Sequence, residues 1–281
     1  MLNALTIDVE DYFHVAAFER YVRAEDWPRY PLRVEDNTSR ILDMLDEFSV
    51  KATFFVLAWV AERCSSLVRE IQRRGHHVAC HGYGHKLIYR IGPDNFRKDV
   101  RESKKLLEDI CGRQVRGYRA PSYSITKRSL WALDILIEEG FLYDSSIFPI
   151  VHDLYGIPGA DRFPHVISRP SGIIREFPMS TIQVGVSNIR YRVPVAGGGY
   201  LRLFPAGLIR KAVNHINRSE HQPAVIYFHP WEIDPGQPRI CAGFKSRFRH
   251  YLNLDKTAGK IRYLLGSLQF GPMEDVLDHA K

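Results

Sequence analysis

The feature of this sequence that most constrains its fold is a regular alternation of short strand-like runs with longer segments of helical character. Strand-like runs lie at 4–9, 52–60, 76–80, 115–118, 141–143 and 224–228. Segments with helically spaced apolar residues or a stop glycine lie at 37–48, 65–74, 94–110, 126–140 and 206–217. Strands that alternate with helices of about 10–15 residues favour parallel pairing through βαβ units. We therefore predict an α/β fold built on a parallel sheet.

The alternation of strand-like and helical segments stops between residues 151 and 204. Five prolines lie in this stretch, around a strand-like segment at 172–179. We predict that this stretch is a β-rich or loop-rich insertion that covers the functional site. Residues 245–281 predict a peripheral, helical C-terminal segment. We find no repeat and no clear linker, so we expect one domain over residues 1–281, a length that supports a sizeable core.

Composition and charge narrow the class of protein. No run approaches the ~18 consecutive apolar residues of a membrane span, and the N-terminus lacks the features of a signal peptide, so we expect a cytoplasmic protein. The net charge is +7, but the basic residues are dispersed and show no aromatic-interleaved stripe of the nucleic-acid-binding kind. The charge is compatible with an anionic polysaccharide or a lipid-linked substrate near a membrane. The four cysteines form no CxxC pair, which predicts reduced thiols.

Five polar clusters follow the strand-like runs in a fixed order. They are Asp8-Val9-Glu10-Asp11, His81-Gly82-Tyr83-Gly84-His85, Arg119-Ala120-Pro121, Asp144-Ser145-Ser146 and Phe228-His229-Pro230-Trp231-Glu232. In parallel α/β folds, active-site residues collect at the carboxyl ends of the strands, so we expect these clusters to meet. Carboxylates, paired histidines, an arginine and a late histidine are the groups that a metal-assisted hydrolase needs.

His81 and His85 are candidate metal ligands. An i, i+4 histidine pair is weak support by itself, because His77 and His81 form a second such pair. Gly82 and Gly84 favour a tight turn instead of a plain helix, and a tight turn lets the backbone approach an ion closely. Imidazole is a strong ligand for zinc and similar metals. From the spacing alone, a metal site and a chance pair of histidines are equally favoured.

Asp8, Glu10 and Asp11 place three carboxylates directly after the first strand-like run. They could lie at a solvated strand end and cap the next element. Alternatively, Asp8 and Glu10 share one strand face, where a cation would relieve their mutual repulsion. His229 ends a strongly apolar run and could either bond within the core or serve as a semi-buried general acid. In the second case, Asp144 is a candidate for the partner that tunes its pKa.

Together these motifs resemble the polysaccharide deacetylases of carbohydrate esterase family four, which share the chitooligosaccharide-deacetylase homology domain. The resemblance runs from Thr6 to about Pro235 and is strongest to the branch linked to exosortase and exopolysaccharide loci. It implies a distorted (β/α) barrel with fewer than eight strands. It also implies a hydrolase that removes N-acetyl groups from an amino-sugar polysaccharide or a lipid-linked oligosaccharide. The implied cofactor is a divalent metal, zinc before cobalt, manganese or nickel.

The resemblance also implies a catalytic role for each matched residue. Asp8 matches the general base, and Arg119 matches the arginine that orients it. His229 matches the general acid, with Asp144 where the family places the carboxylate that tunes the acid. The backbone N–H of Ser122 matches the oxyanion donor, although the family usually has an aromatic residue at that position.

The metal ligands carry over with one departure from the family pattern. His81 and His85 match the metal-binding histidines. The family's metal-binding aspartate directly follows the base, and here that position is Val9. Glu10 or Asp11 must then supply the third ligand, and we favour Glu10 because it shares a strand face with Asp8.

Two other functions fit the same residues. One is a metal-dependent amidohydrolase for a small non-sugar amide, in which residues 151–204 would close a pocket instead of bordering an open groove. The other is a non-catalytic glycan-binding module that has lost full metal ligation, as Val9 would suggest. The chain keeps the residues that match the base, the acid and the orienting arginine, which argues against a non-catalytic glycan-binding module.

Overall fold

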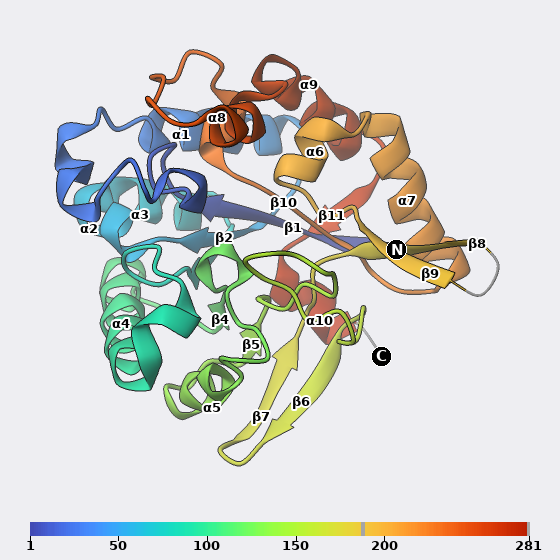
Figure 1. The fold of residues 1–281 in the computed structure, drawn as a ribbon, viewed down its shortest axis with the longest axis horizontal. Coiled ribbons are helices and arrows are strands. Elements are labelled where there is room, and N and C mark those ends of the chain that lie inside the picture. The colour runs from blue at the N-terminus through green and yellow to red at the C-terminus, as the bar shows by residue number, and fades with distance from the viewer. Residues whose placement is uncertain (187–188, 280–281) are drawn as a thin grey trace.

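A curled, half-barrel sheet of nine strands forms the centre of the molecule (Figure 1). The computed structural model describes residues 1–186 and 189–279. The strand order is β10-β1-β2-β3-β4-β5-β7-β6, and β11 pairs with the start of β1. Every neighbouring pair is parallel except the antiparallel hairpin of β6 and β7. Within the described residues, the path from β10 to β7 holds seven strands paired in parallel, and the curled sheet confirms the predicted α/β fold of the distorted (β/α) barrel kind.

Seven strands of this sheet overlap predicted strand-like runs, whereas β6 and β11 were not predicted. The strands of the sheet are β1 (Leu2–Val9), β2 (Thr53–Val56), β3 (His77–Cys80), β4 (Gly117–Tyr118), β5 (Tyr143–Asp144), β6 (His165–Arg169), β7 (Gly172–Glu176), β10 (Val225–Phe228) and β11 (Gln269–Gly271). In β1 every residue after the first is buried. A strand of a parallel sheet is covered on both faces and so reads as an apolar run, which is why strands such as β1 could be found from sequence.

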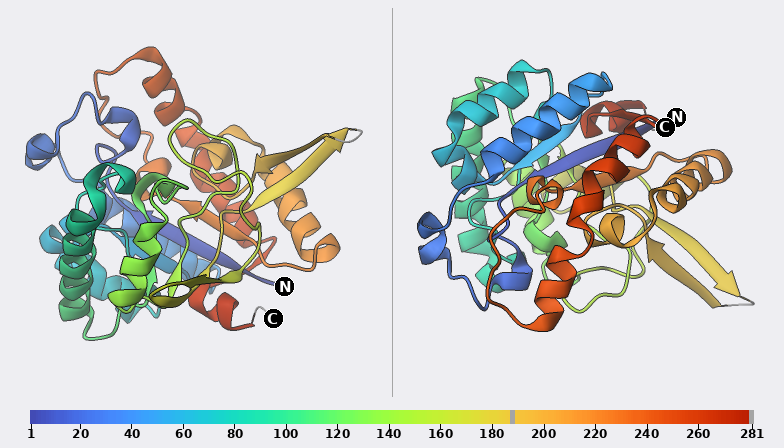
Figure 2. Two further views of the ribbon diagram at one scale, coloured as in Figure 1. Left: turned by 60° about the horizontal axis from the view of Figure 1, so that its bottom comes forward. Right: turned by 90° about the horizontal axis from the view of Figure 1, so that it is seen from above.

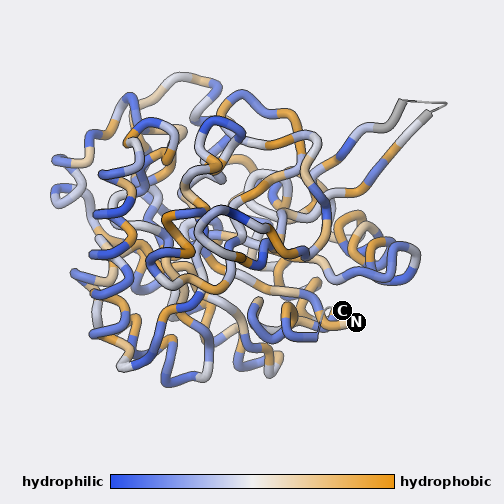
Figure 3. Tube along the Cα trace, turned by 90° about the horizontal axis from the view of Figure 1, so that it is seen from below, coloured by the Kyte–Doolittle hydropathy of each residue, from blue (hydrophilic) through white to orange (hydrophobic). Residues whose placement is uncertain are grey.

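The helices cover the sheet (Figure 1). They are α1 (Val34–Glu47), α2 (Ala58–Arg63), α3 (Ser65–Arg73), α4 (Ile88–Cys111), α5 (Trp131–Glu138), α6 (Gly199–Leu203), α7 (Ala206–Ser219), α8 (Phe244–Tyr251), α9 (Leu254–Leu265) and α10 (Met273–His279). Figure 3 shows hydrophilic and hydrophobic stretches alternating along the outer helices, as expected for helices with one face on a sheet. No helix among the described residues is long and apolar enough to cross a membrane.

Residues 151–204 divide into parts with different positions. The hairpin of β6 and β7 extends the main sheet, because β7 pairs with β5. A second hairpin, β8 (Thr181–Val186) with β9 (Ile189–Pro194), forms its own two-stranded sheet and projects from the body (Figure 2). Only part of the predicted insertion therefore lies outside the main sheet.

Two further differences from the sequence prediction concern element boundaries. The first helical segment, predicted to begin at residue 37, begins at Val34 in α1. The C-terminal segment is not wholly peripheral, because β11 pairs in register with the first residues of the central strand β1. The four cysteines are free thiols, as predicted.

Candidate active site

Three of the five predicted polar clusters line one cleft of about 660 Å³ at the carboxyl ends of the parallel strands. Asp8 is on β1, His81 follows β3, and His229 follows β10. The cleft lining includes Asp8, Glu10, His81, His85, Ser122 and His229. Their convergence follows from parallel pairing, which brings the carboxyl ends of neighbouring strands to one edge of the sheet.

Asp8 is held in place by a buried arginine. Its Oδ1 accepts a hydrogen bond of 2.6 Å from Nη1 of Arg119, a side chain with no exposed surface. The same Nη1 donates to Oγ1 of Thr6 at 2.8 Å, while the Nε and Nη2 groups of Arg119 donate to the carbonyl and hydroxyl oxygens of Ser145. A buried guanidinium is stable only when its donors are paired. These contacts therefore fix the orientation of the Asp8 carboxylate at the cleft floor.

Glu10, His81 and His85 form a group that can hold a metal ion. One ligand atom from each lies within 4.8 Å of the others. Nδ1 of His81 donates to the carbonyl oxygen of Arg119 at 2.8 Å, because a carbonyl can only accept. That bond leaves the lone pair of Nε2 available, the usual arrangement for a ligating histidine. Burial lowers the pKa of His81 to about 4 and keeps the imidazole neutral, as a ligand must be.

The environment of Glu10 fits the same group. Burial alone would raise the pKa of Glu10, but His85 beside it, with His229 and His81 further away, holds that pKa well below its usual range. Its Oε2 lies 2.9 Å from Nε2 of His85, yet no hydrogen bond of acceptable geometry reaches this buried oxygen. An anionic oxygen left without a donor beside two imidazoles is a donor set that suits a divalent cation such as zinc.

The turn that presents the two histidines depends on a glycine. Gly82 has φ of +72°, in the left-handed region, and a Cβ there would lie 3.0 Å from Oδ1 of Asp99. The same Asp99 oxygen accepts a hydrogen bond from the N–H of Tyr83 at 3.0 Å. The sequence prediction of a tight turn between His81 and His85 is therefore correct, and Gly82 is the residue that the turn requires.

Asp11 lies outside the metal group. Its Oδ2 accepts hydrogen bonds from the N–H groups of Arg33 (2.6 Å) and Val34 (2.9 Å), and its Oδ1 accepts from the N–H of Tyr12 (2.9 Å). Asp11 thus satisfies free N–H groups at the start of α1. Of the two candidates for a third ligand, the structure places Glu10 with the histidines.

The carboxylate in contact with His229 is Glu232, so the predicted pairing with Asp144 is wrong. Nδ1 of His229 lies 2.9 Å from Oε2 of Glu232. Asp144 instead accepts a hydrogen bond from Oγ of Ser146 at 2.5 Å and lies opposite Glu176 in the register of β5 and β7. The signal in the sequence was the position of Glu232, three residues after His229 in a turn that begins with proline, where its side chain can reach back.

Glu232 raises the pKa of His229, so that the ring keeps its proton at neutral pH. Burial alone would lower the pKa of His229, but the hydrogen bond and charge of Glu232, with smaller effects of Glu10 and Asp8, raise it to about 9. Nε2 of His229 lies 3.6 Å from Oε1 of Glu10 and 3.9 Å from Oδ2 of Asp8. At neutral pH the ring therefore carries a proton that faces the cleft.

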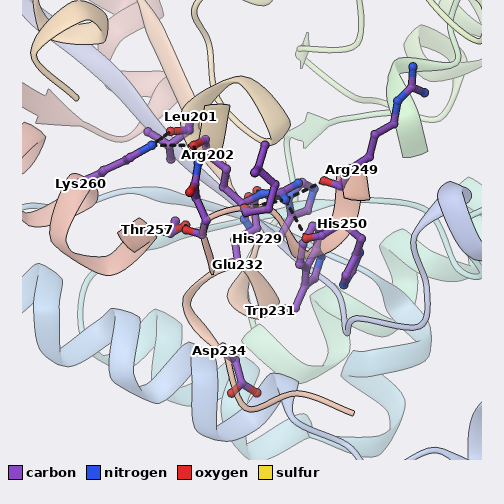
Figure 4. Close-up of polar contacts among 12 residues, drawn as sticks. Leu201, Arg202, His229, Trp231, Glu232, Asp234, Arg249, His250, Thr257 and Lys260 are labelled. Atoms are coloured by element: carbon purple, nitrogen blue, oxygen red, sulfur yellow. Dashed lines mark hydrogen bonds and ion pairs between the residues drawn. The ribbon is translucent and has the colours of Figure 1, made fainter. Parts of the chain in front are cut away.

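Arg202 holds Glu232 in turn, and sequence analysis missed it. Nε of Arg202 donates to Oε1 of Glu232 at 2.6 Å, and its Nη1 donates to the carbonyl oxygens of Arg249 and His250, each at 2.7 Å (Figure 4). Nζ of Lys260 donates to the carbonyl oxygens at the end of α6. Charged contacts thus join α6, α8 and α9 to the His229 turn. Arg202 lay inside the stretch predicted as an insertion, so nothing in the sequence pointed to it.

Ser122 lies on the cleft in a constrained turn. It has φ of +52° and ψ of +29°, and the next residue, Tyr123, also has a positive φ. Left-handed conformations are costly for residues other than glycine and persist where the surrounding structure enforces them, often at functional sites. The position is consistent with the oxyanion role that the family resemblance implies.

Comparison with known proteins divides the chain into two matched regions. Residues 25–136 match the family "Polysaccharide deacetylase", and residues 145–278 match a "Domain of unknown function" (DUF3473). His81, His85 and Arg119 fall in the first region, while Arg202, His229 and Glu232 fall in the second. Asp8 and Glu10 precede both. The site is therefore assembled from the two regions together.

Individual relatives agree with the first match. A "Peptidoglycan-N-acetylglucosamine deacetylase" of Bacillus cereus is 32% identical over 98 residues, which is 34% of this chain and 36% of that protein. The chain thus spans about a third of the length of this curated relative.

Solved structures share the fold along nearly the whole chain. A Mycobacterium smegmatis protein assigned provisionally to the polysaccharide deacetylases has a TM-score of 0.62 and 21% identity, covering 98% of this chain and 88% of that one. A "CE4 family pseudoenzyme" from Bacillus anthracis has a TM-score of 0.52 and 14% identity, covering 99% and 65%. Similarity at this level concerns the fold alone, so the function must be argued from the site.

Proposed function

We propose that this chain is a metal-dependent hydrolase that removes N-acetyl groups from the amino sugars of a glycan, because residues 25–136 match the family "Polysaccharide deacetylase". The observation that supports this most is the arrangement of three units around one cleft. They are the Asp8–Arg119 pair, the group of Glu10, His81 and His85, and the protonated His229. Base, ligands and acid are the parts that hydrolysis of an acetamide needs.

Asp8 is the general base of the proposed reaction. A divalent cation bound by Glu10, His81 and His85 would supply Lewis-acid polarisation of the acetyl carbonyl and a lower pKa for water. Arg119 keeps Asp8 oriented, so that its free oxygen can accept the proton of the attacking water. The backbone N–H of Ser122 would then stabilise charge on the acyl oxygen, an interaction typically worth ~3–4 kcal/mol in the transition state.

His229 is the general acid. Hydrolysis of an amide releases an amine, which leaves only after its nitrogen has been protonated. Nδ1 of His229 is fixed by Glu232, so the proton on Nε2 is the one directed at the reacting groups. Arg202 neutralises the other oxygen of Glu232 and holds its carboxylate against the ring. His229, Glu232 and Arg202 all lie in residues 145–278, the region that matches the "Domain of unknown function".

The proposed substrate is an amino-sugar polysaccharide or a lipid-linked oligosaccharide of exopolysaccharide biosynthesis. The proposed metal is zinc. The lipid-linked form is supported by the cleft, whose lining includes the apolar residues Leu154, Leu203, Phe244 and Phe248 near its charged floor. The ligand set of two imidazoles and one carboxylate supports zinc, because it is one that catalytic zinc sites use.

Acetate release tests the proposal. The protein would be stripped of metal, reloaded with zinc or cobalt, and assayed with N-acetylhexosamine oligomers and with a small non-sugar amide. We expect acetate from the oligomers only after reloading. Hydrolysis of the small amide alone would favour the amidohydrolase alternative. Metal binding with no acetate released from any oligomer would contradict the deacetylase, and failure to bind metal would favour a glycan-binding module.

Substitution Glu232→Gln is expected to move the alkaline limb of the pH–rate profile to lower pH by about 1–3 units. The limb reports loss of the proton from His229, and the Glu232 charge raises that pKa. An amide still accepts a hydrogen bond from Nδ1 but carries no charge, so His229 loses its proton at a lower pH.

Asp144→Asn is the matched control for that substitution, because Asp144 is the carboxylate that the sequence had paired with His229. The limb should keep its position in this variant, whatever the absolute rate. A shift in Asp144→Asn with none in Glu232→Gln would reverse the structural assignment.

A further inference from the structure

Helix α8 presents two phenylalanines to solvent. Phe244 is 84% exposed and Phe248 is 54% exposed, and their rings stack at a centroid separation of 6.2 Å. The same helix has three exposed basic residues, Lys245, Arg247 and Arg249, and no acidic residue. None of these three side chains forms an ion pair with any described residue. Exposed aromatic rings beside unpaired cations distinguish this helix from an ordinary solvated one.

The exposed face of α8 is continuous with the mouth of the active-site cleft. Phe244, Phe248, Leu203 and Leu154 all line the cleft, and Leu203 and Leu154 are themselves 52% and 38% exposed. These residues come from α8, α6 and the loop before β6. We call this set of four residues the cleft rim. Figure 2 shows α8 at the edge of the molecule.

The inner face of α8 is fixed to the catalytic residues. The ring of His250 stacks on Trp231 with centroids 4.1 Å apart, and Trp231 stacks on His229 at 5.1 Å. Nε1 of Trp231 donates to Oε1 of Glu10 at 3.3 Å. Arg202 bonds to the α8 carbonyls, as described above. Any surface that contacts the outer face of α8 is therefore held at a set position relative to the reacting groups.

We propose that α8 and the cleft rim dock on an anionic lipid bilayer, and that the site acts on amino-sugar glycans held at that surface by a lipid. The two phenylalanines would enter the headgroup region while the three cations pair with lipid phosphates. The net charge of +7 adds a favourable long-range attraction to such a surface. The substrate class rests on the proposed deacetylase function, whereas the docking does not.

Charge favours a lipid surface over a second copy of this chain. A second copy placed symmetrically on α8 would bring like charges together, because the helix has cations and no carboxylate to pair with them. An anionic bilayer neutralises all three cations at once.

Vesicle sedimentation tests the docking without any turnover. Wild-type protein should sediment with phosphatidylcholine vesicles that contain phosphatidylglycerol, and high salt should weaken this binding. The double substitution Phe244→Ser with Phe248→Ser should lower the binding at least about tenfold, since two phenyl groups leave the headgroup region. The triple substitution Lys245→Gln, Arg247→Gln and Arg249→Gln should abolish the preference for phosphatidylglycerol.

The hairpin of β6 and β7 offers a matched control. Val166 and Ile173 are 57% and 67% exposed there, so replacing both by serine removes a comparable apolar surface from another part of the molecule. This variant should bind vesicles as wild type does, and unchanged thermal melting would show that the α8 variants remain folded. Equal binding to vesicles with and without phosphatidylglycerol, or an equal loss in the control, would overturn the proposal. So would a phenylalanine-dependent dimer, measured by sedimentation velocity, with no vesicle binding.

The two proposals can fail separately. Vesicle binding without acetate release from any glycan would leave the docking intact and contradict the deacetylase. Acetate release from soluble oligomers without vesicle binding would support the deacetylase and contradict the docking. If both hold, a lipid-linked N-acetylhexosamine oligomer in phosphatidylglycerol vesicles should be deacetylated faster than the soluble oligomer, and the double phenylalanine variant should lose that difference.

Discussion

Substitution of Asp8 by asparagine is expected to lower kcat by about 10²–10⁴-fold, the range that a general base typically contributes. Asparagine has nearly the same shape, and its carbonyl oxygen can still accept the 2.6 Å hydrogen bond from Arg119. It cannot take up a proton from water at neutral pH. The fold and the position of Arg119 should therefore persist while the proton transfer is lost. Steady-state acetate release measures the effect.

Metal content separates this role from ligation. Asp8 is not part of the group formed by Glu10, His81 and His85, so the Asp8→Asn protein should retain its metal. Loss of metal together with activity would instead make Asp8 a ligand. Asp43→Asn is a suitable control, since Asp43 is a largely exposed carboxylate paired with Arg74 at the surface. It should change neither activity nor metal content.

Substitution Glu10→Gln is expected to weaken metal binding by more than the 10–100-fold that typically follows loss of a partner outside the ligand shell. Glu10 supplies the only carboxylate of the three-residue group, and its buried Oε2 has no hydrogen-bond donor among the described residues. An amide removes the negative charge that would offset a divalent cation beside the two imidazoles. Titration of the stripped protein with zinc, in competition with a chelator, measures the affinity.

Asp11→Asn is the matched comparison, one residue further along the chain. Asp11 accepts three backbone hydrogen bonds at the start of α1, and asparagine has only one acceptor oxygen. This variant should keep its metal affinity and lose stability by about 1–3 kcal/mol, the range for leaving a buried donor unsatisfied. Thermal melting measures that loss. The reverse ranking of the two variants in metal titration would contradict the assignment of Glu10.

The strands that carry the site could be predicted, because a strand buried on both faces is an apolar run in the sequence. The runs that became β1, β2 and β10 are largely apolar, and parallel pairing brings the polar ends of neighbouring strands together. Asp8, the two histidines of the metal group and His229 could be placed at one site on this basis. The order of strands is not needed for that inference.

The position of Glu232, three residues after His229, was a signal for its partner, but it did not outweigh the position of Asp144 at the end of a strand. Asp144 ends a strand, as an active-site residue would, but its neighbour is Glu176 on β7. Because the residues of β7 fall in the predicted insertion, no second carboxylate was expected opposite Asp144. The reach of Glu232 depends on the turn after His229, which is set by tertiary structure.

The role of Asp11 could not be predicted, because it depends on a contact between residues far apart in the sequence. Three carboxylates in four residues look equivalent along the chain. The helix that Asp11 caps begins more than twenty residues later, at Val34. Long-range contacts of this kind leave no periodic signal in a single sequence.

The central place of β1 sets the time at which this molecule can first fold. Its neighbours on the sheet are β2 on one side and β10 on the other, with β11 beside its first residues, so two of its three partners lie more than 200 residues away in the chain. During synthesis, the edge of β1 that will meet β10 stays open until Val225–Phe228 has left the ribosome. Pairings this distant in sequence form slowly, and an unpaired apolar edge invites intermolecular pairing. A nascent chain therefore exposes this edge of β1 while the more than 200 residues between β1 and β10 are made.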